Sequence, residues 1–122
     1  GLGKPLKSMI HPTQPIPIHL GSMSPKGQEL AGELCDGLHL TAMIPERPEV
    51  ALDNVKRGFD KRTDSKKLED FELFTNVNVI LLNNKGETTQ SVQEKIFMTK
   101  ASMALYVGGM GTKAKNFYKE YF

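Results

Sequence analysis

Apolar and polar positions divide the first half of the chain into short apolar runs, each followed by an amphipathic stretch. An apolar run at 16–20 precedes a helical pattern at 25–35, and a run at 38–43 precedes a helical pattern at 48–61. The runs have the length of strands, whereas the longer stretches repeat their apolar residues at helical spacing. Pro17 lacks an N–H group and disfavours a fully paired central strand for the first run. The pattern predicts two successive strand–helix units.

The second half contains the strongest strand signal of the chain. Residues 71–82 are rich in Val, Ile, Phe and Leu. The residues at 83–86 have the composition of a turn, and a long helix is expected at 87–106. The glycines within 108–111 break that helix, and Thr112 can cap a final one. A third strand–helix unit followed by a last helix is therefore predicted.

This alternation predicts an α/β fold with a parallel sheet and right-handed crossovers. Three parallel strands alone leave two open edges and one uncovered face, although parallel sheets are normally buried on both sides. A chain of 122 residues holds one domain at most. It starts with Gly1 rather than methionine and stops inside an amphipathic pattern. We expect a larger body to be missing, so that the chain is a fragment.

Composition and charge exclude several classes of protein. Hydrophobic residues make up 39% and charged residues 25% of the chain, which is typical of a globular protein. The net charge of +2 gives no support to nucleic-acid binding. The basic cluster is interleaved with aspartates, which predicts a solvated helix face and loop; it consists of Lys56, Arg57, Lys61, Arg62, Lys66 and Lys67.

A single cysteine, Cys35, allows no internal disulfide and fits a reducing compartment. It ends an apolar helix stripe made of Leu30, Ala31 and Leu34, so a buried and inert thiol is favoured over a nucleophile. No apolar run approaches the ~20 residues of a membrane span, and no leader pattern opens the chain. We expect a cytoplasmic protein with no membrane or nucleic-acid partner.

A strand–turn–helix corner at 21–27 is the most informative feature of the sequence. Ser24 suits the N-cap of the following helix and Pro25 its first position. Backbone N–H groups and the helix dipole attract phosphate at such a corner, and the Ser22 and Ser24 hydroxyls and Lys26 can assist. An ordinary capped helix is the alternative. The glycine spacing of a Walker loop or a dinucleotide fingerprint is absent.

The other candidates for chemistry are weaker. The three histidines, His11, His19 and His39, stand on separate segments without the spacing of metal ligands, so no metal site is predicted. His19 and His39 both fall in strands, where they can be neighbours across a parallel pair, and acid–base work by one of them stays open. The glycine-rich string at 106–111 is either a hinge between helices or a binding loop.

Two blocks of sequence resemble the luciferase-like flavin and deazaflavin oxidoreductases, a family that includes monooxygenases. The first block covers 17–26 and 30–37. The second covers 105–111 with Asn116, Phe117 and Tyr118, and together with the opening at 3–7 it points to the branch that uses coenzyme F-420. That branch includes methylene-tetrahydromethanopterin reductase. The resemblance spans nearly the whole chain.

The resemblance implies that residues 1–122 are the C-terminal part of a single TIM (β/α)8 barrel, incomplete in this chain. The cofactor then lies at the C-terminal ends of the strands, where barrels often bind phosphate. The residues matching the family's phosphate turn are Gly21, Ser22, Met23, Ser24 and Gly27. The resemblance also implies hydride transfer between the cofactor and a small-molecule substrate. The cofactor would be coenzyme F-420 or, alternatively, FMN, and the protein would be a homodimer. No catalytic residue carries over, because the ring-packing positions belong to the family's first half.

Two other functions remain open at this stage. The chain can be a non-catalytic barrel remnant with a structural or dimerisation role, or an anion-binding module of independent fold. The corner at 21–27 fits all three hypotheses, whereas the string at 106–111 fits only the oxidoreductase and the barrel remnant.

Overall fold

The computed structural model describes residues 3, 9–82, 85, 89–111 and 115–120. Its sheet has three parallel strands, β1 (His19–Gly21), β2 (Gly37–Leu40) and β3 (Glu72–Thr75), in the order β1-β2-β3. The predicted α/β fold with a parallel sheet is confirmed. β1 lies at an edge, as the proline at position 17 suggested, and it begins at His19 rather than at residue 16.

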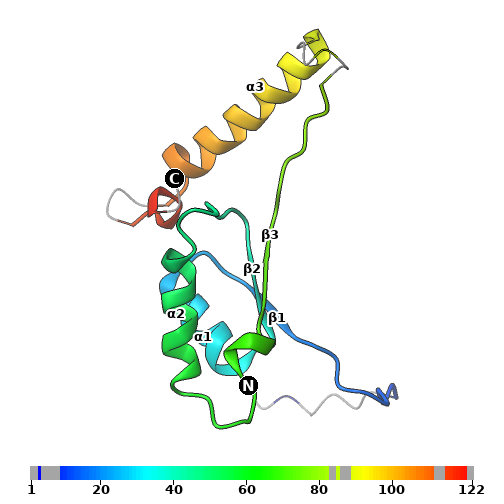
Figure 1. The fold of residues 1–122 in the computed structure, drawn as a ribbon, viewed down its shortest axis with the longest axis vertical. Coiled ribbons are helices and arrows are strands. Elements are labelled where there is room, and N and C mark those ends of the chain that lie inside the picture. The colour runs from blue at the N-terminus through cyan, green and yellow to red at the C-terminus, as the bar shows by residue number, and fades with distance from the viewer. Residues whose placement is uncertain (1–2, 4–8, 83–84, 86–88, 112–114, 121–122) are drawn as a thin grey trace.

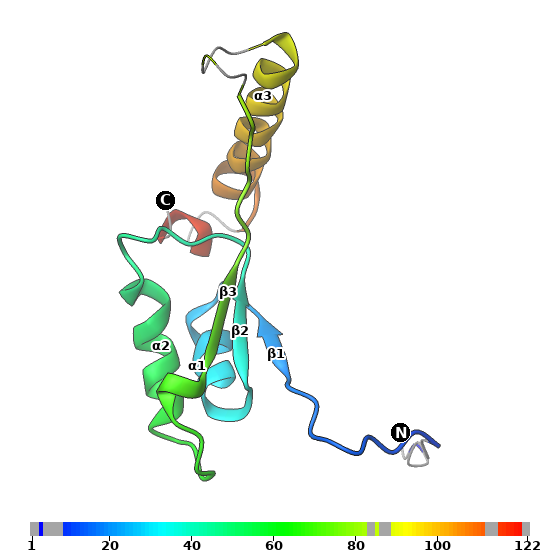
Figure 2. The same cartoon turned by 45° about the vertical axis from the view of Figure 1, so that its right-hand side comes forward.

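Two helices cover one face of the sheet. The chain passes from β1 into α1 (Pro25–Leu34) and from β2 into α2 (Glu49–Phe59), and both helices lie on the same side (Figures 1 and 2). The core forms between them and the sheet from Met23, Ala31, Cys35, Leu38, Leu40, Ala51 and Val55. Burial raises the pKa of the Cys35 thiol above its usual value, and neighbouring Asp36 raises it further. The predicted buried thiol is confirmed.

The two helices approach each other through glycines, and of the predicted apolar stripe only Ala31 and Cys35 are buried in the core. A β-carbon on Gly32 would overlap the carbonyl oxygen of Val55, and one on Gly58 would overlap that of Glu29. Leu30 and Leu34 are instead 45% and 65% exposed, which corrects their assignment to the core. A close crossing needs small residues at the contact, so the interface turns Gly32 toward α2 and leaves the leucines on the flank of α1.

The opposite face of the sheet is not covered by any described helix (Figure 2). His19, His39 and Phe74 lie on it, with ring centroids 5.0 Å apart for His19 and Phe74 and 6.4 Å apart for His39 and Phe74. His19 Nε2 also lies 2.8 Å from a carboxylate oxygen of Glu72. The two histidines are thus diagonal neighbours across the β1–β2 pair, because His19 stands opposite Gly37 and His39 opposite Gly21.

The third strand is much shorter than predicted. Only Glu72–Thr75 pairs with β2, and residues 76–82 continue without regular secondary structure. Val77, Val79 and Leu81 on this segment are 75%, 75% and 83% exposed. An apolar alternating sequence forms a strand only where a neighbour accepts its backbone hydrogen bonds, and β2 ends at Leu40. The predicted turn at 83–86 lies outside the described residues except for Lys85.

A long helix, α3 (Gln90–Ala104), projects away from the sheet (Figures 1 and 2). The Thr89 side chain caps it by accepting a hydrogen bond from the Val92 N–H at 3.3 Å. The helix continues as a π turn, η2 (Leu105–Gly109), and a short 3₁₀ turn, η3 (Phe117–Glu120), follows. Gly108 and Gly109 belong to this last helical turn, and the helix ends after Gly109, so the predicted end of the helix within 108–111 is confirmed. Thr112 lies outside the described residues.

The basic cluster is only partly a solvated face. The side chain of Arg62 is 5% exposed; it donates to the carbonyl oxygens of Gly32 and Cys35, both at 2.8 Å, and pairs with Asp64. Lys66 pairs with Asp36 at 2.8 Å. Asp64 and Lys66 belong to the short loop that leads from α2 to η1 (Leu68–Asp70). Arg62 satisfies carbonyl groups at the C-terminal end of α1, where a cation is favoured by the helix dipole.

None of the described helices combines the length and the apolar character that a membrane span requires.

Candidate functional site

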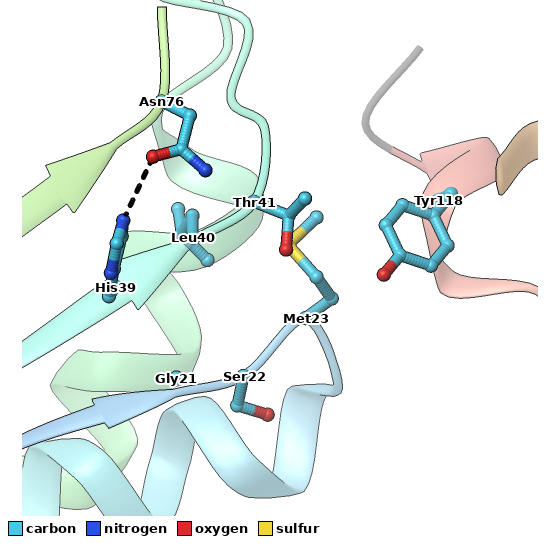
Figure 3. A pocket seen from close by; sticks show the side chains of 8 residues that line it. All are labelled: Gly21, Ser22, Met23, His39, Leu40, Thr41, Asn76 and Tyr118. Atoms are coloured by element: carbon cyan, nitrogen blue, oxygen red, sulfur yellow. Dashed lines mark hydrogen bonds between the residues drawn. The ribbon is translucent and has the colours of Figure 1, made fainter. Parts of the chain in front are cut away.

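A cavity of ≈ 320 Å³ opens at the C-terminal ends of the three strands. Four separate parts of the chain build its wall: the turn after β1, the end of β2, the residue after β3 and the C-terminal turn η3 (Figure 3). Its lining consists of Gly21, Ser22, Met23, His39, Leu40, Thr41, Asn76 and Tyr118. The carboxyl ends of parallel strands meet at one edge of a sheet, which is where α/β folds place their ligand sites.

The turn between β1 and α1 is held by two serines. Ser24 is the N-cap of α1: its Oγ accepts a hydrogen bond from the Gly27 N–H at 3.1 Å. The Ser22 Oγ in turn accepts one from the Ser24 N–H at 3.2 Å, and the two hydroxyl oxygens lie 3.3 Å apart. The predicted cap and strand–turn–helix geometry are confirmed.

This arrangement leaves donors for an anion. Only one of the two serine hydroxyls can donate in the bond that joins them, so the other O–H remains to donate outward. α1 also leaves the first-turn N–H of Lys26 without an intrahelical partner, and Lys26 itself is exposed. One hydroxyl, one N–H group and the positive end of the helix dipole thus lie at this corner, which suits a phosphate group.

Gly27 is required by the serine arrangement, whereas Gly21 is not. A β-carbon on Gly27 would lie 2.8 Å from the Ser22 Cβ and 3.0 Å from the Ser24 Oγ. A β-carbon on Gly21 would make only an ordinary contact, 4.0 Å from the His39 carbonyl oxygen. Tight packing therefore selects glycine at position 27, and Gly21 has space for a larger side chain.

The five predicted site residues divide into two groups. Gly21, Ser22 and Met23 line the cavity, whereas Ser24 and Gly27 stand behind Ser22 and hold it in place. Met23 is 7% exposed and also belongs to the core cluster, so it contributes packing rather than a polar contact.

The structure brings His39 into the cavity together with Asn76. The His39 Nε2 lies 3.2 Å from the Asn76 Oδ1, and Figure 3 shows this contact across the ends of β2 and β3. If Nε2 carries the proton, the Nδ1 of a neutral ring is left as an acceptor. His19 is not part of this site, because it pairs with Glu72 on the open face of the sheet.

Sequence reasoning missed the three polar side chains of the lining other than those of Ser22 and His39, namely Thr41, Asn76 and Tyr118. The first two come directly after β2 and β3, so correct strand ends would have pointed to them. The predicted strands ran through both positions instead. Tyr118 belongs to a block that carried the family resemblance, but nothing in the sequence places it beside β1.

A second cavity of ≈ 510 Å³ adjoins the first and shares Thr41, Asn76 and Tyr118 with it. It lies between the loops after β2 and β3 and the end of α3, where Ser102 and Met103 of α3 and Tyr106 of η2 contribute. None of the described residues that line it carries a charged side chain. Among the described residues no group of three or more His, Cys, Asp or Glu side chains could hold a metal ion.

Comparison with known proteins gives a consistent result. Residues 4–121 match the family described as luciferase-like monooxygenase. The chain is 32% identical over 123 residues to a Mycobacterium tuberculosis protein named for coenzyme F-420-dependent oxidoreductase activity, an alignment covering 100% of this chain and 33% of that protein. It is 36% identical over 64 residues to 5,10-methylenetetrahydromethanopterin reductase of Archaeoglobus fulgidus, covering 52% of this chain and 19% of the reductase. No solved structure matches the chain.

Proposed function

This chain belongs to the luciferase-like monooxygenase family, and we propose that the protein containing it is an oxidoreductase that uses coenzyme F-420. The two relatives named above are called an F-420-dependent oxidoreductase and a methylenetetrahydromethanopterin reductase. The chain spans at most about a third of the length of these relatives. The activity of the whole protein is therefore inferred from them.

The corner between β1 and α1 is our proposed seat for the cofactor phosphate. Gly21, Ser22 and Met23 would face the cofactor, and Ser24 with Gly27 would hold the Ser22 hydroxyl in place. The observation that carries this proposal is the cavity at the C-terminal ends of three parallel strands, bordered by a capped helix N-terminus. The donor set fits a phosphate, and none of the described residues that line the cavity is acidic and would repel one.

The bound cofactor would supply the hydride that is exchanged with the substrate. The residues of this chain would bind and orient it. His39 and Asn76, at the cavity wall, offer a hydrogen-bonding pair to the part of the cofactor beyond the phosphate. No residue is assigned to the chemical step.

We further propose that residues 1–122 are the C-terminal part of a TIM barrel. The uncovered sheet face, which carries His19, Glu72 and Phe74, would then face the barrel interior. The exposed flank of α1 at Leu30 and Leu34 would contact the preceding helix of the barrel. Parallel sheets are normally covered on both faces, which supports this placement. A homodimer acting on a small-molecule substrate in the cytoplasm completes the proposal.

Titration of the intact protein with coenzyme F-420 and with FMN, followed by absorbance or fluorescence, tests the function. We expect saturable binding of coenzyme F-420. Tighter binding of FMN would mean that the cofactor is a flavin and not the deazaflavin. Binding of neither compound would contradict the oxidoreductase function and favour a non-catalytic barrel remnant.

The variant Ser24→Asp tests the position of the phosphate. Aspartate is as good an N-cap as serine, so α1 should keep its cap, but the carboxylate would repel a phosphate. We expect coenzyme F-420 to bind at least roughly tenfold more weakly. Ser65→Asp, which adds the same charge to an exposed loop, serves as the control. Equal affinity of the Ser24→Asp variant and the wild type would mean that the phosphate lies elsewhere.

A further inference from the structure

The side chain of Asn116 holds the glycine-rich string at the end of α3. Its Nδ2 lies 3.2 Å from the Tyr106 carbonyl oxygen, 2.8 Å from that of Val107 and 2.7 Å from that of Met110. These are carbonyl groups that a helix leaves unpaired at its C-terminal end. Gly111, with φ of 88°, lets the chain leave the helix toward Asn116. The string is therefore the helix terminus that Asn116 caps.

The same side chain fixes the turn that follows. The Asn116 Oδ1 accepts a hydrogen bond from the Tyr118 N–H at 3.0 Å. The rings of Tyr106 and Tyr118 lie 5.0 Å apart with an interplanar angle of 46°. Residues 106–111 and 116–118, which we call the C-terminal latch, thus form one hydrogen-bonded unit that determines where Tyr118 lies.

The C-terminal latch brings Tyr118 to the phosphate corner, which stands about a hundred residues earlier in the sequence. Tyr118 lines the cavity with Gly21, Ser22 and Met23, and Figure 3 shows its hydroxyl end turned toward Met23. It also packs against the core cluster. Among the residues that the structure describes, no other lining residue of this cavity comes from beyond position 76.

The hydroxyl is the part of the Tyr118 side chain that could bind a ligand, because packing alone requires only the ring. None of the residues that the structure describes forms a hydrogen bond with this hydroxyl. Phenylalanine would fill the same space and stack on Tyr106 equally well. The Tyr118 side chain is half-buried, but its hydroxyl stays accessible at the cavity, so a ligand that enters this cavity can accept a hydrogen bond from it.

We propose that the Tyr118 hydroxyl donates a hydrogen bond to the anionic group held at the corner between β1 and α1, and that Asn116 is the residue that positions it. This inference rests on the proposed function, because the anion is taken to be the cofactor phosphate. The proposal also gives the glycine-rich string a role. The string ends the helix, which allows Asn116 to cap the helix terminus and to position Tyr118.

The test compares Tyr118→Phe with Tyr106→Phe in the intact protein. Two ligands are titrated into each variant: coenzyme F-420 and the phosphate-free deazaflavin chromophore. A hydrogen bond to a charged group is worth enough to weaken binding roughly tenfold or more. We expect this loss for coenzyme F-420 with Tyr118→Phe and little change for the phosphate-free chromophore. Tyr106→Phe should cause a clearly smaller loss, because phenylalanine keeps the ring contact with Tyr118 and Tyr106 does not line the corner cavity. Thermal melting checks that both variants fold.

The positioning role of Asn116 is tested by a double-mutant cycle. Asn116→Ala should weaken coenzyme F-420 binding as Tyr118→Phe does, and the double variant should be little weaker than either single one. Independent losses that add would show a purely structural role for Asn116 and overturn that part of the proposal.

The outcomes separate this inference from the proposed function. If the wild type binds neither coenzyme F-420 nor FMN, the proposed function fails. If the wild type binds coenzyme F-420 and Ser24→Asp weakens it, but Tyr118→Phe does not, only the role of Tyr118 is overturned. Equal weakening of both ligands by Tyr118→Phe would also overturn it, because the hydroxyl would then contact the chromophore rather than the phosphate.

Discussion

The hydroxyl oxygens of Ser22 and Ser24 lie 3.3 Å apart, in a turn where Gly27 leaves no room for a β-carbon. Because one serine hydroxyl donates to the other, the second hydroxyl is left to donate outward, and this requires the turn to keep its packing. The corner depends on Gly27 as much as on the serines.

Replacing Gly27 by alanine should therefore impair binding more than folding. The new β-carbon would force the Ser22 side chain away from Ser24, and the hydrogen bond from the Ser24 N–H would be lost. Alanine gains up to about 1 kcal/mol of helix propensity over glycine, which offsets the lost bond. We expect weaker coenzyme F-420 binding with a nearly unchanged free energy of unfolding. Gly3→Ala, whose added β-carbon would meet no atom within 4 Å and which does not line the cavity, is the control, and equal binding by both variants would contradict the prediction.

The crossing of α1 and α2 should not tolerate a β-carbon at Gly32 or Gly58. In both cases the added atom would meet backbone atoms, which cannot rotate away as a side chain can. We expect each alanine variant to lower the free energy of unfolding by about 1–3 kcal/mol, measured by urea denaturation of the intact protein. Gly108→Ala serves as the control, since a β-carbon added there would meet no atom within 4 Å. Variants at 32 and 58 as stable as the control would refute the close crossing.

The ion pair of Arg62 with Asp64 should make stability depend on pH in the acidic range. The hydrogen bond from the Arg62 guanidinium lowers the pKa of Asp64 from 3.8 to about 2. A carboxyl group with a lowered pKa contributes stability that is present above its unfolded pKa and is lost as the pH falls through its folded pKa. The melting temperature of the wild type should exceed that of Asp64→Asn at pH 5, and the difference should shrink toward pH 2. A difference that stays constant with pH would exclude this ionisation as its cause.

The Cys35 thiol should react slowly while the protein is folded. It is 9% exposed, and burial raises its pKa, so little thiolate is present at neutral pH. We expect slow modification by a thiol reagent such as dithiobis(nitrobenzoic acid) in buffer and fast modification in urea. Rapid reaction under native conditions would show that α1 and the sheet open readily around Cys35.

Local chemistry made part of this site readable in the sequence. The Ser24 cap and the proline at the first position of α1 depend on residues within one turn of each other, and both are found as predicted. The lengths of the strands were not predictable in the same way. Residues 76–82 have the composition of a strand, but β2 ends at Leu40 and offers them no partner.

Which side chains of a helix are buried also depends on the elements that pack against it, and the sequence does not show these. The spacing of Leu30 and Leu34 is that of a buried stripe, yet the close approach of Gly32 to α2 turns these leucines outward. Likewise, the alternation of Arg62 with aspartates is typical of a solvated face. The carbonyl groups at the end of α1 draw this arginine inward instead.

By itself the sequence determined the order of strands and helices, the parallel sheet, the capped corner at 21–27 and the family resemblance, because all of these follow from local spacing and short motifs. Only the tertiary structure decided that His39, Asn76 and Tyr118 meet at that corner. Their meeting depends on strand register and on the three-carbonyl cap of Asn116, and both are contacts between residues whose separation in sequence gives no local signal.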